Sequence, residues 1–417
     1  MKFEVRLNEK YIASYIVCLL MTGKNLLPFY FAKMIEDHFI LDIGTTFFSI
    51  ILMGIYILMH TKKLDLKFLT VAVIYVPLIF STLINGGNMF HVVWHSTEVL
   101  LVCKLLETIK DDEKQLIPFL TAIRDFTLLF YIMNFGVMFM MPKGIPSISA
   151  GKLWPWFLYG NVNTTIKYIL PGICCSLLLD DKNHKKFSLS TLIFLGGIVF
   201  SALTVYFTAT AVIADTIIIL WVMFFFILKK KTWRYFALPF IGGAMFEFLV
   251  VFTTSATKFV VFITTLFNKS LTFSGRAPLW VQEYRLFLRQ PLFGYGYISF
   301  AKLEHIVGNG NGAHNYYLDM MHQRGLFGLG VLLIFFLFPI LYNWNKDVSS
   351  KRLFIIMGIC GAYAVMFLSE PFYTSENTFI PLFYILFLSC FKKQTSAEKM
   401  KQRLQKLIPN GLGGQYE

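Results

Sequence analysis

Apolar runs of about 20 residues recur along almost the whole chain and leave few folds open to it. Because an α-helix needs roughly 20 residues to cross the hydrocarbon core of a bilayer, each run is a predicted membrane span. The windows fall near residues 11–31, 39–60, 68–85, 91–109, 116–141, 164–180, 187–207, 209–228, 234–253, 326–343, 353–370 and 376–391. The sequence therefore predicts an all-α, polytopic integral membrane protein with about twelve transmembrane helices.

The composition also indicates a chain that is embedded in lipid. Of its 417 residues, 56% are hydrophobic, 15% are charged and 45 are Phe, which is outside the usual range of soluble domains. No change in composition marks a second domain, so residues 1–417 are predicted to form a single membrane domain. The N-terminal apolar stretch has no small-residue cleavage site after it, so we expect a retained first span.

The cysteines give no sign of a disulfide framework or a zinc site. All six lie inside apolar runs without paired spacing, where they act as small hydrophobic residues. They are Cys18, Cys103, Cys174, Cys175, Cys360 and Cys390.

Positive charge, which gives the chain a formal net charge of +14, is gathered in short clusters between apolar runs. Nucleic-acid binding would need a basic face on a folded domain, so we expect no nucleic-acid partner. The positive-inside rule instead predicts that such clusters occupy alternate, cytoplasmic loops of the cell membrane, with both termini cytoplasmic. The clusters that fall on this side are Lys2, Arg6 and Lys10; Lys62, Lys63 and Lys67; Lys110 and Lys114; Lys182, Lys185 and Lys186; Lys229, Lys230, Lys231 and Arg234; Lys346, Lys351 and Arg352; and the tail from Lys392 to Lys406.

Two longer loops are predicted on the opposite, extracytoplasmic side, at 142–163 and 254–325. The second lies between spans 9 and 10. Loops longer than about 15 residues are usually functional or disordered, and the aromatic content of 254–325 favours a loop that packs against the bundle. On the cytoplasmic side, the basic tail 392–417 is either a surface-lying amphipathic helix or a solvated tail.

Three arginines in the large outer loop form the first candidate site. Pro278 suits the first turn of a helix on which Arg285 and Arg289, four residues apart, share a face. With Arg276 nearby in sequence, these planar guanidinium groups suit a pyrophosphate. Anchoring of the helix to lipid headgroups explains the same pattern equally well.

A histidine at the mouth of a predicted helix forms the second candidate. The flexible stretch Gly308-Asn-Gly-Asn-Gly312 leads to His314, Asn315 and Tyr316 near the outer membrane surface. A histidine there suits a general base or, when protonated, a donor to phosphate. A lone histidine is more often structural.

Ionisable residues within the predicted spans are expensive in lipid and usually face a cavity or a partner. Among them, Glu370 ranks first because it lies at the outer end of its span beside Pro371, on the side of the arginines and the histidine. Snorkelling to the interface explains two others near span ends. The full set is Glu98, Lys104, Asp215, Glu247 and Glu370, with Lys104 and Glu247 as the two near span ends.

Three ordered motifs resemble those of the O-antigen ligase and polysaccharide polymerase superfamily. They are Ser274-Gly-Arg-Ala-Pro-Leu-Trp280, then Gln290-Pro-Leu-Phe-Gly-Tyr-Gly296, then the segment 313–328, AHNYYLDMMHQRGLFG. Gly160-Asn-Val-Asn163 and Leu368-Ser-Glu370 are similar to further elements of the family. Where members often carry Ser-Arg after the seventh span, this chain has Thr208-Ala-Thr210, and Arg124 is either a substitute or a cytoplasmic-edge charge.

The resemblance implies inverting, metal-independent glycosyl transfer on the outer face of the cytoplasmic membrane, without a cofactor. The substrates would be a polyprenyl-pyrophosphate-linked glycan donor and acceptor, and a chain-length regulator and a flippase are implied partners beside membrane lipid. The residues implied as catalytic are His314, Arg289 and Arg276. The residues implied as substrate-binding are Arg285, Asn315, Tyr316, Trp280, Glu370, Asn161 and Asn163.

The sequence favours a polymerase of capsule or O-antigen repeat units and leaves two alternatives open. A ligase that moves the finished chain to a lipid or wall acceptor belongs to the same class. A polysaccharide transporter or flippase also commonly has about twelve spans, but its halves usually match, whereas the loops here are distributed unevenly.

Overall fold

The computed structural model describes residues 9–61, 66–150, 155–161, 163–184, 187–204, 209–227, 231–252, 265, 275–308, 312–348, 350–372 and 375–391. Helices dominate this part of the chain, which confirms an all-α membrane protein. One short hairpin interrupts the helical pattern, in which Trp156 pairs with Asn161 and Phe157 with Gly160. The predicted amphipathic helix in the tail 392–417 lies outside the described residues.

The helices and strands follow one another without a change of class. They are α1 (Glu9–Leu26), α2 (Phe29–Glu36), α3 (Phe39–His60), α4 (Leu69–Ile84), α5 (Met89–Ile109), α6 (Glu113–Met140), α7 (Pro146–Ser149), β1 (Trp156–Phe157), β2 (Gly160–Asn161), α8 (Thr165–Lys182), α9 (Leu189–Thr204), α10 (Ala209–Ile227), η1 (Trp233–Phe236), α11 (Ala237–Phe246), η2 (Glu247–Phe252), α13 (Arg276–Arg289), α14 (Phe300–Val307), α15 (Tyr316–Tyr342), α16 (Lys351–Met366) and α17 (Glu376–Ser389).

A helix occupies each of the twelve predicted windows, but the number of spans stays a prediction. Among the described residues, five helical segments are long and apolar enough to cross a membrane, or six if α1 and α2 form one bent span. These two helices meet at 87°. Pro28 stands between them and explains the break, because proline lacks an N–H and disfavours a helical residue before it.

The tenth predicted span, near residues 326–343, begins where α15 breaks at Gly325. The helix expected after His314 forms from Tyr316, so the last part of the predicted loop 254–325 is helical and continues across the break into the span. This first part of α15 carries polar side chains between Asp319 and Arg324. They are buried by protein and not exposed to lipid, which makes them compatible with a bundle.

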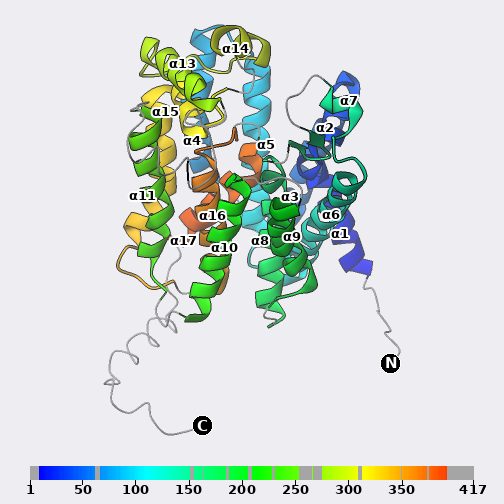
Figure 1. Ribbon diagram of the computed structural model, residues 1–417. Coiled ribbons are helices and arrows are strands. Elements are labelled where there is room, and N and C mark those ends of the chain that lie inside the picture. Colours follow the sequence, from blue (N-terminus) through cyan, green and yellow to red (C-terminus); the bar gives the residue numbers. More distant parts are fainter. Residues whose placement is uncertain are drawn as a thin grey trace, which may run out of the picture.

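The helices stand side by side in one bundle, with α13 and α14 lying across its upper end in Figure 1. The start of α1 lies at the opposite end. The two candidate sites, the arginines of α13 and His314, therefore lie at the end of the bundle remote from the start of α1. The assignment of these ends to the two sides of the membrane stays a prediction.

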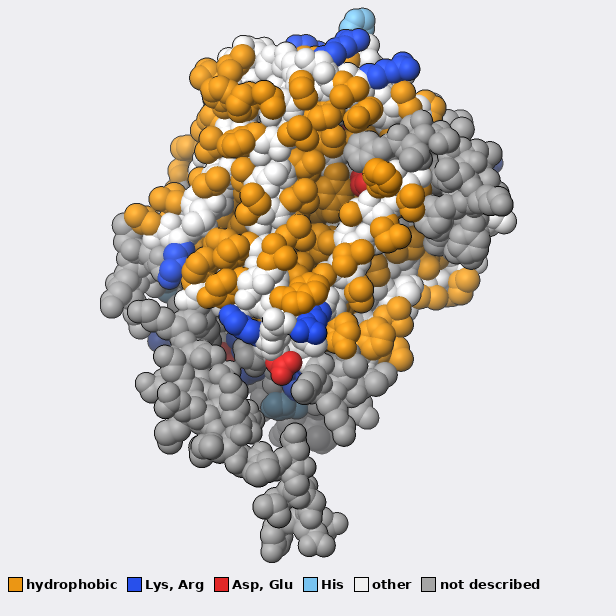
Figure 2. Space-filling view, turned by 90° about the vertical axis from the view of Figure 1, so that its left-hand side faces the viewer, with side chains coloured by type: hydrophobic (Ala, Val, Ile, Leu, Met, Phe, Trp, Pro, Cys, Tyr) orange, Lys and Arg blue, Asp and Glu red, His pale blue; other side chains and the backbone are white. Residues whose placement is uncertain are grey.

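The flank of the bundle carries an apolar surface suited to lipid. Hydrophobic side chains cover most of the face in Figure 2, with Lys and Arg gathered near its upper and lower edges. On α11 and η2, Leu238, Ile241, Met245 and Phe248 are 52–67% exposed at helical spacing. This arrangement is the one expected of a multi-pass membrane protein.

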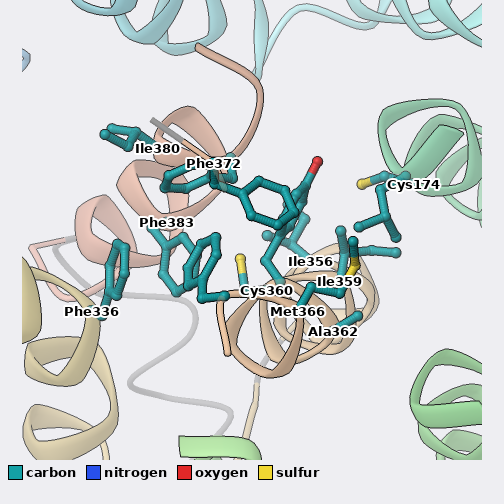
Figure 3. Close-up of a cluster of buried hydrophobic side chains, with 14 of the residues drawn as sticks. Cys174, Phe336, Ile356, Ile359, Cys360, Ala362, Met366, Phe372, Ile380 and Phe383 are labelled. Carbon is teal, nitrogen blue, oxygen red and sulfur yellow. The ribbon is translucent and has the colours of Figure 1, made fainter. Parts of the chain in front are cut away.

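The centre of the bundle is built around α16. Aromatic side chains of α15 and α17 pack beside it, with the rings of Phe336 and Phe383 stacked at 4.0 Å (Figure 3). On another side the Trp221 indole donates to the Phe354 carbonyl at 2.7 Å. A Cβ at Gly358 would overlap the Trp221 ring, so the absence of a side chain there allows α10 to approach α16 closely.

A buried ion pair joins α15 to α17. Arg324 Nη2 lies 2.5 Å from Glu376 Oε1, and both side chains are at most 2% exposed. The same carboxylate accepts a hydrogen bond from the Tyr316 hydroxyl at 2.7 Å, and His95 Nε2 lies 3.5 Å from its other oxygen. The Arg324 guanidinium also lies over the Tyr75 ring. Three helices, α5, α15 and α17, therefore meet at one carboxylate.

We expect Glu376→Ala to destabilise the protein by about 3–5 kcal/mol, because it leaves the Arg324 charge buried without its partner. The double variant R324M/E376L should recover much of that loss, since it removes both charges together. Thermal unfolding of the purified proteins in detergent measures both effects, with Glu304→Ala on exposed α14 as the control. Equal stability of Glu376→Ala and the double variant would contradict this account.

Candidate functional site

The helix that carries the predicted arginines, α13, forms as expected and lies on the upper end of the bundle. Gly275 precedes it with φ 86°, and Pro278 occupies its first turn, where a missing N–H costs nothing. Its inward face buries Trp280, Glu283 and Phe287. This packing against α15 fixes where the arginines of the helix point.

Three predicted site residues from separate segments meet at the start of α13. Arg276 Nη2 lies 2.8 Å from Glu370 Oε1, and His314 Nδ1 lies 3.8 Å from Glu370 Oε2. The Glu370 side chain is 1% exposed, whereas Arg276 and His314 are 19% and 23% exposed. A buried carboxylate thus holds two partly exposed basic groups, which we call the Arg276–Glu370–His314 cluster.

Glu370 lies after the end of α16, in the segment that leads to α17. Burial opposes ionisation of its carboxyl, but the Arg276 guanidinium and the His314 ring more than offset this penalty and hold the pKa below its usual value. Glu370 is therefore a carboxylate at neutral pH, and it can orient both basic groups.

His314 has a backbone conformation that is rare for residues other than glycine, with φ 51°. Contacts on both sides hold it there. The Trp280 indole donates to the Ala313 carbonyl at 3.0 Å. On the other side, the Asn315 side chain caps α15 by accepting from Tyr317 N and Leu318 N. Strained conformations held in this way occur often at functional sites.

Two residues next to His314 have structural contacts. Asn315 is fully buried and donates from its amide to Glu247 Oε1 at 2.6 Å, in addition to capping α15. Tyr316 is also fully buried and donates to Glu376. With Trp280, these side chains fix the position of His314, and a direct contact of any of the three with substrate stays a prediction.

The remaining arginines of α13 lie apart from the cluster. Arg285 and Arg289 are exposed, on the side of the helix away from buried Glu283 and Phe287. Arg285 and Arg289 share one face of α13, as their spacing predicted. The structure brings Arg276 into contact with Glu370, but not these two, so they form a separate basic surface beside the cluster.

The second and third motifs dock against one another. The α15 helix breaks at Gly325, where φ is 64°, and the segment 291–296 supplies backbone partners around the break. Leu326 N donates to Pro291 O at 2.8 Å, and Tyr295 N donates to His322 O at 2.8 Å. A Cβ at Gly325 would overlap the Leu292 carbonyl, which explains the glycine.

The Gly160-to-Asn163 turn leads into α8. Asn161 Oδ1 accepts from Asn163 N at 2.8 Å, which shapes the turn. One turn into α8, Lys167 Nζ donates to the carbonyl of Pro371 at 3.0 Å, next to Glu370. The sequence reading missed Lys167, although a lysine inside an apolar window was a signal. It links the turn to the segment that carries Glu370.

Snorkelling is the wrong explanation for two ionisable residues, because both are buried beside protein partners. Lys104 Nζ lies 3.5 Å from Glu107 Oε2, and Glu247 accepts from Asn315. Glu98 accepts from Asn25 at 2.6 Å.

Two further residues weighed from the sequence lie outside the cluster. Arg124 pairs with its neighbour Asp125 at 2.6 Å, so its guanidinium is engaged there. Asp215 is buried, and neither of its oxygens has a hydrogen bond within the described part of the chain.

Comparison with known proteins matches residues 192–333 to the family model described as O-antigen ligase. This match confirms the predicted resemblance to the O-antigen ligase and polysaccharide polymerase superfamily, and it includes α13 and His314. An uncharacterized protein of Haemophilus influenzae is 25% identical over 142 residues, which cover 30% of this chain and 34% of that protein. The chain therefore spans about a third of that relative. No solved structure matches.

We expect Glu370→Gln to lower the melting temperature at neutral pH, because it removes the charge that pairs with Arg276. The depressed pKa of Glu370 contributes stability above its unfolded-state pKa of about 4.3, and this contribution disappears as the pH falls through the lower folded-state pKa. The difference between wild type and variant should thus be constant near pH 7 and shrink below about pH 4. A difference independent of pH would argue against the ion pair.

Proposed function

We propose that this multi-pass membrane protein polymerises oligosaccharide repeat units linked to a polyprenyl pyrophosphate, on the outer face of the cytoplasmic membrane. The family match supports activity of the O-antigen ligase and polymerase type on lipid-linked glycans. The Arg276–Glu370–His314 cluster is the observation that supports the chemistry, since it combines a cation and a potential base at the end of an apolar bundle.

The donor pyrophosphate would lie against Arg276. Arg276 donates to Glu370 through Nη2, and a guanidinium has five N–H donors, so others are left for phosphate oxygens. Arg285 and Arg289 lie about 14 and 20 Å further along α13 at 1.5 Å per residue, so these exposed arginines suit the pyrophosphate of the second lipid-linked substrate. Arg276 would offset the charge that grows on the leaving pyrophosphate.

His314 would act on the acceptor hydroxyl. A small movement of its ring toward Glu370, across the 3.8 Å that separate Nδ1 from Oε2, would form a carboxylate–imidazole pair and leave Nε2 as the base. The acceptor oxygen then bonds to the anomeric carbon while the bond from that carbon to the pyrophosphate oxygen breaks. The proton passes to His314, and the electron pair leaves with the lipid pyrophosphate.

This reaction inverts the anomeric centre and places no metal ion at the transferred bond, since pyrophosphate already activates the leaving group. Asn161 and Asn163 begin the helix whose Lys167 reaches the Glu370 segment, so their turn would form another wall of the site. A flippase would supply the lipid-linked repeats, and a chain-length regulator would set the extent of polymerisation.

A ligase is the alternative within the same class, because the same cluster would serve any sugar hydroxyl on an acceptor. The family description itself is that of a ligase. A transporter is the alternative from another class, and the cluster argues against it, since transport alone requires no general base.

We expect His314→Ala and Arg276→Ala to lower the rate of polymer formation by about a hundredfold or more. Arg289→Ala should also lower it by weakening binding of the second lipid-linked substrate. Lys302→Ala and His305→Ala are matched controls on exposed α14 and should retain the activity. The measurement is elongation of lipid-linked repeats by purified protein in liposomes. Normal elongation by the His314 variant would refute the proposed base.

Deletion of the gene should distinguish the two activities of the class. Loss of a polymerase leaves single repeats on the final acceptor, whereas loss of a ligase leaves long chains on the lipid carrier. We expect single repeats on gel separation of the extracted glycans. Accumulation of long lipid-linked chains would favour the ligase.

A further inference from the structure

A second group of polar side chains lies on the buried side of α13. Glu283 of α13 and Asp319 and His322 of α15 each offer one ligand atom, and these atoms all lie within 4.8 Å of one another. We propose that these three residues bind a divalent transition-metal ion that fastens α13 to α15. The proposal assigns the ion a structural role and does not depend on the proposed transferase activity.

With both carboxylates ionised, the charges of this group do not balance without a further cation. Both carboxylates are fully buried, and His322 Nδ1 is in close contact with Glu283 Oε2. A protonated imidazole offsets only one of the two negative charges. Lys167 contributes some positive potential near Asp319, but it shares that potential with Glu370. Because unpaired buried charge is costly, a doubly charged ion would stabilise the arrangement.

Asp319 points to a missing ligand independently of the overall charge. Its side chain is fully buried, and neither carboxylate oxygen has a hydrogen bond of ordinary geometry among the described residues, although it lies near the backbone of Ala313. Glu283 Oε1 shares this state, whereas Glu283 Oε2 is in contact with His322 Nδ1. Buried polar atoms almost always have partners, so three such oxygens at one place indicate coordination.

The backbone beside the carboxylates keeps room for an ion. Gly312 has φ 68°, and a Cβ there would lie 2.5 Å from Asp319 Oδ1 and 3.5 Å from Glu283 Oε1. Any side chain at this position would fill the space next to the two carboxylates. A glycine at a positive φ preserves that space as well as the turn before His314.

The donor set selects the class of ion. One imidazole nitrogen with two carboxylate oxygens suits Zn²⁺ or Mn²⁺, whereas Mg²⁺ and Ca²⁺ prefer oxygen ligands alone. Asp319 and His322, three residues apart on α15, share one face of that helix, and Glu283 approaches from α13. Coordination would therefore cross-link the two helices seven residues after Arg276, which fixes the position of the arginine.

Metal binding by the whole protein tests the proposal. Protein purified in detergent is stripped with EDTA, dialysed against Zn²⁺ or Mn²⁺, and assayed by elemental mass spectrometry. We expect one ion per chain, little retention of Mg²⁺, and at least tenfold weaker binding by Glu283→Gln, Asp319→Asn and His322→Gln. Glu304→Gln and His305→Gln on exposed α14 are matched controls that should bind as wild type does.

A second measurement on the wild-type protein guards against variants that do not fold. Hydrogen exchange in α13 should slow severalfold when Zn²⁺ is added to the stripped protein, while exchange in α3 should not change. The proposal is overturned if the stripped wild-type protein takes up no ion or if the three variants bind the ion as tightly as the controls. It is also overturned if adding Zn²⁺ does not change hydrogen exchange in α13.

Discussion

The need to pair every charge that the bundle buries governs this structure. Lipid cannot solvate charged groups, so most of those in the described part of the chain have a protein partner, with Asp215 as an exception. Glu376 meets Arg324, and Glu370 meets Arg276, both at hydrogen-bonding distance. Because these partners come from segments far apart in the sequence, each pair also fixes how the segments assemble. The same requirement that stabilises the bundle therefore positions the groups of the candidate site.

The α15 helix supplies Arg324 to the first pair and begins two residues after His314, which lies beside the second. Before its break at Gly325 it is polar and buried by protein, and it carries Asp319, His322 and Arg324. After the break it becomes apolar, with Leu326 half-exposed on the flank of the bundle. The backbone on either side of the break forms hydrogen bonds with the segment 291–296, so the glycine-containing motifs dock that segment against α15. This contact keeps His314, at the start of α15, close to α13.

Much of the fold and part of the site could be predicted from the sequence. Helix positions follow from apolar runs, because burial in lipid is a local requirement that each run meets by itself. The motifs gave Arg276, His314 and Glu370, which the structure brings together. The helix after His314 and the apolar span from residue 326 were both expected, and the structure joins them as α15 across the break at Gly325. Lys104 and Glu247 were misjudged, because charged groups near span ends were expected to reach the membrane interface, whereas both have protein partners.

The sequence by itself determined that this chain is a helical membrane protein with a basic, histidine-bearing segment beside one of its spans. Only the tertiary structure decided which polar groups share a space. Arg276 joins Glu370, while Arg285 and Arg289 remain exposed, and Glu283 turns inward to meet Asp319 and His322. The physical reason is that helix periodicity fixes the face on which a side chain lies, whereas the partner of that face depends on packing between segments distant in the chain.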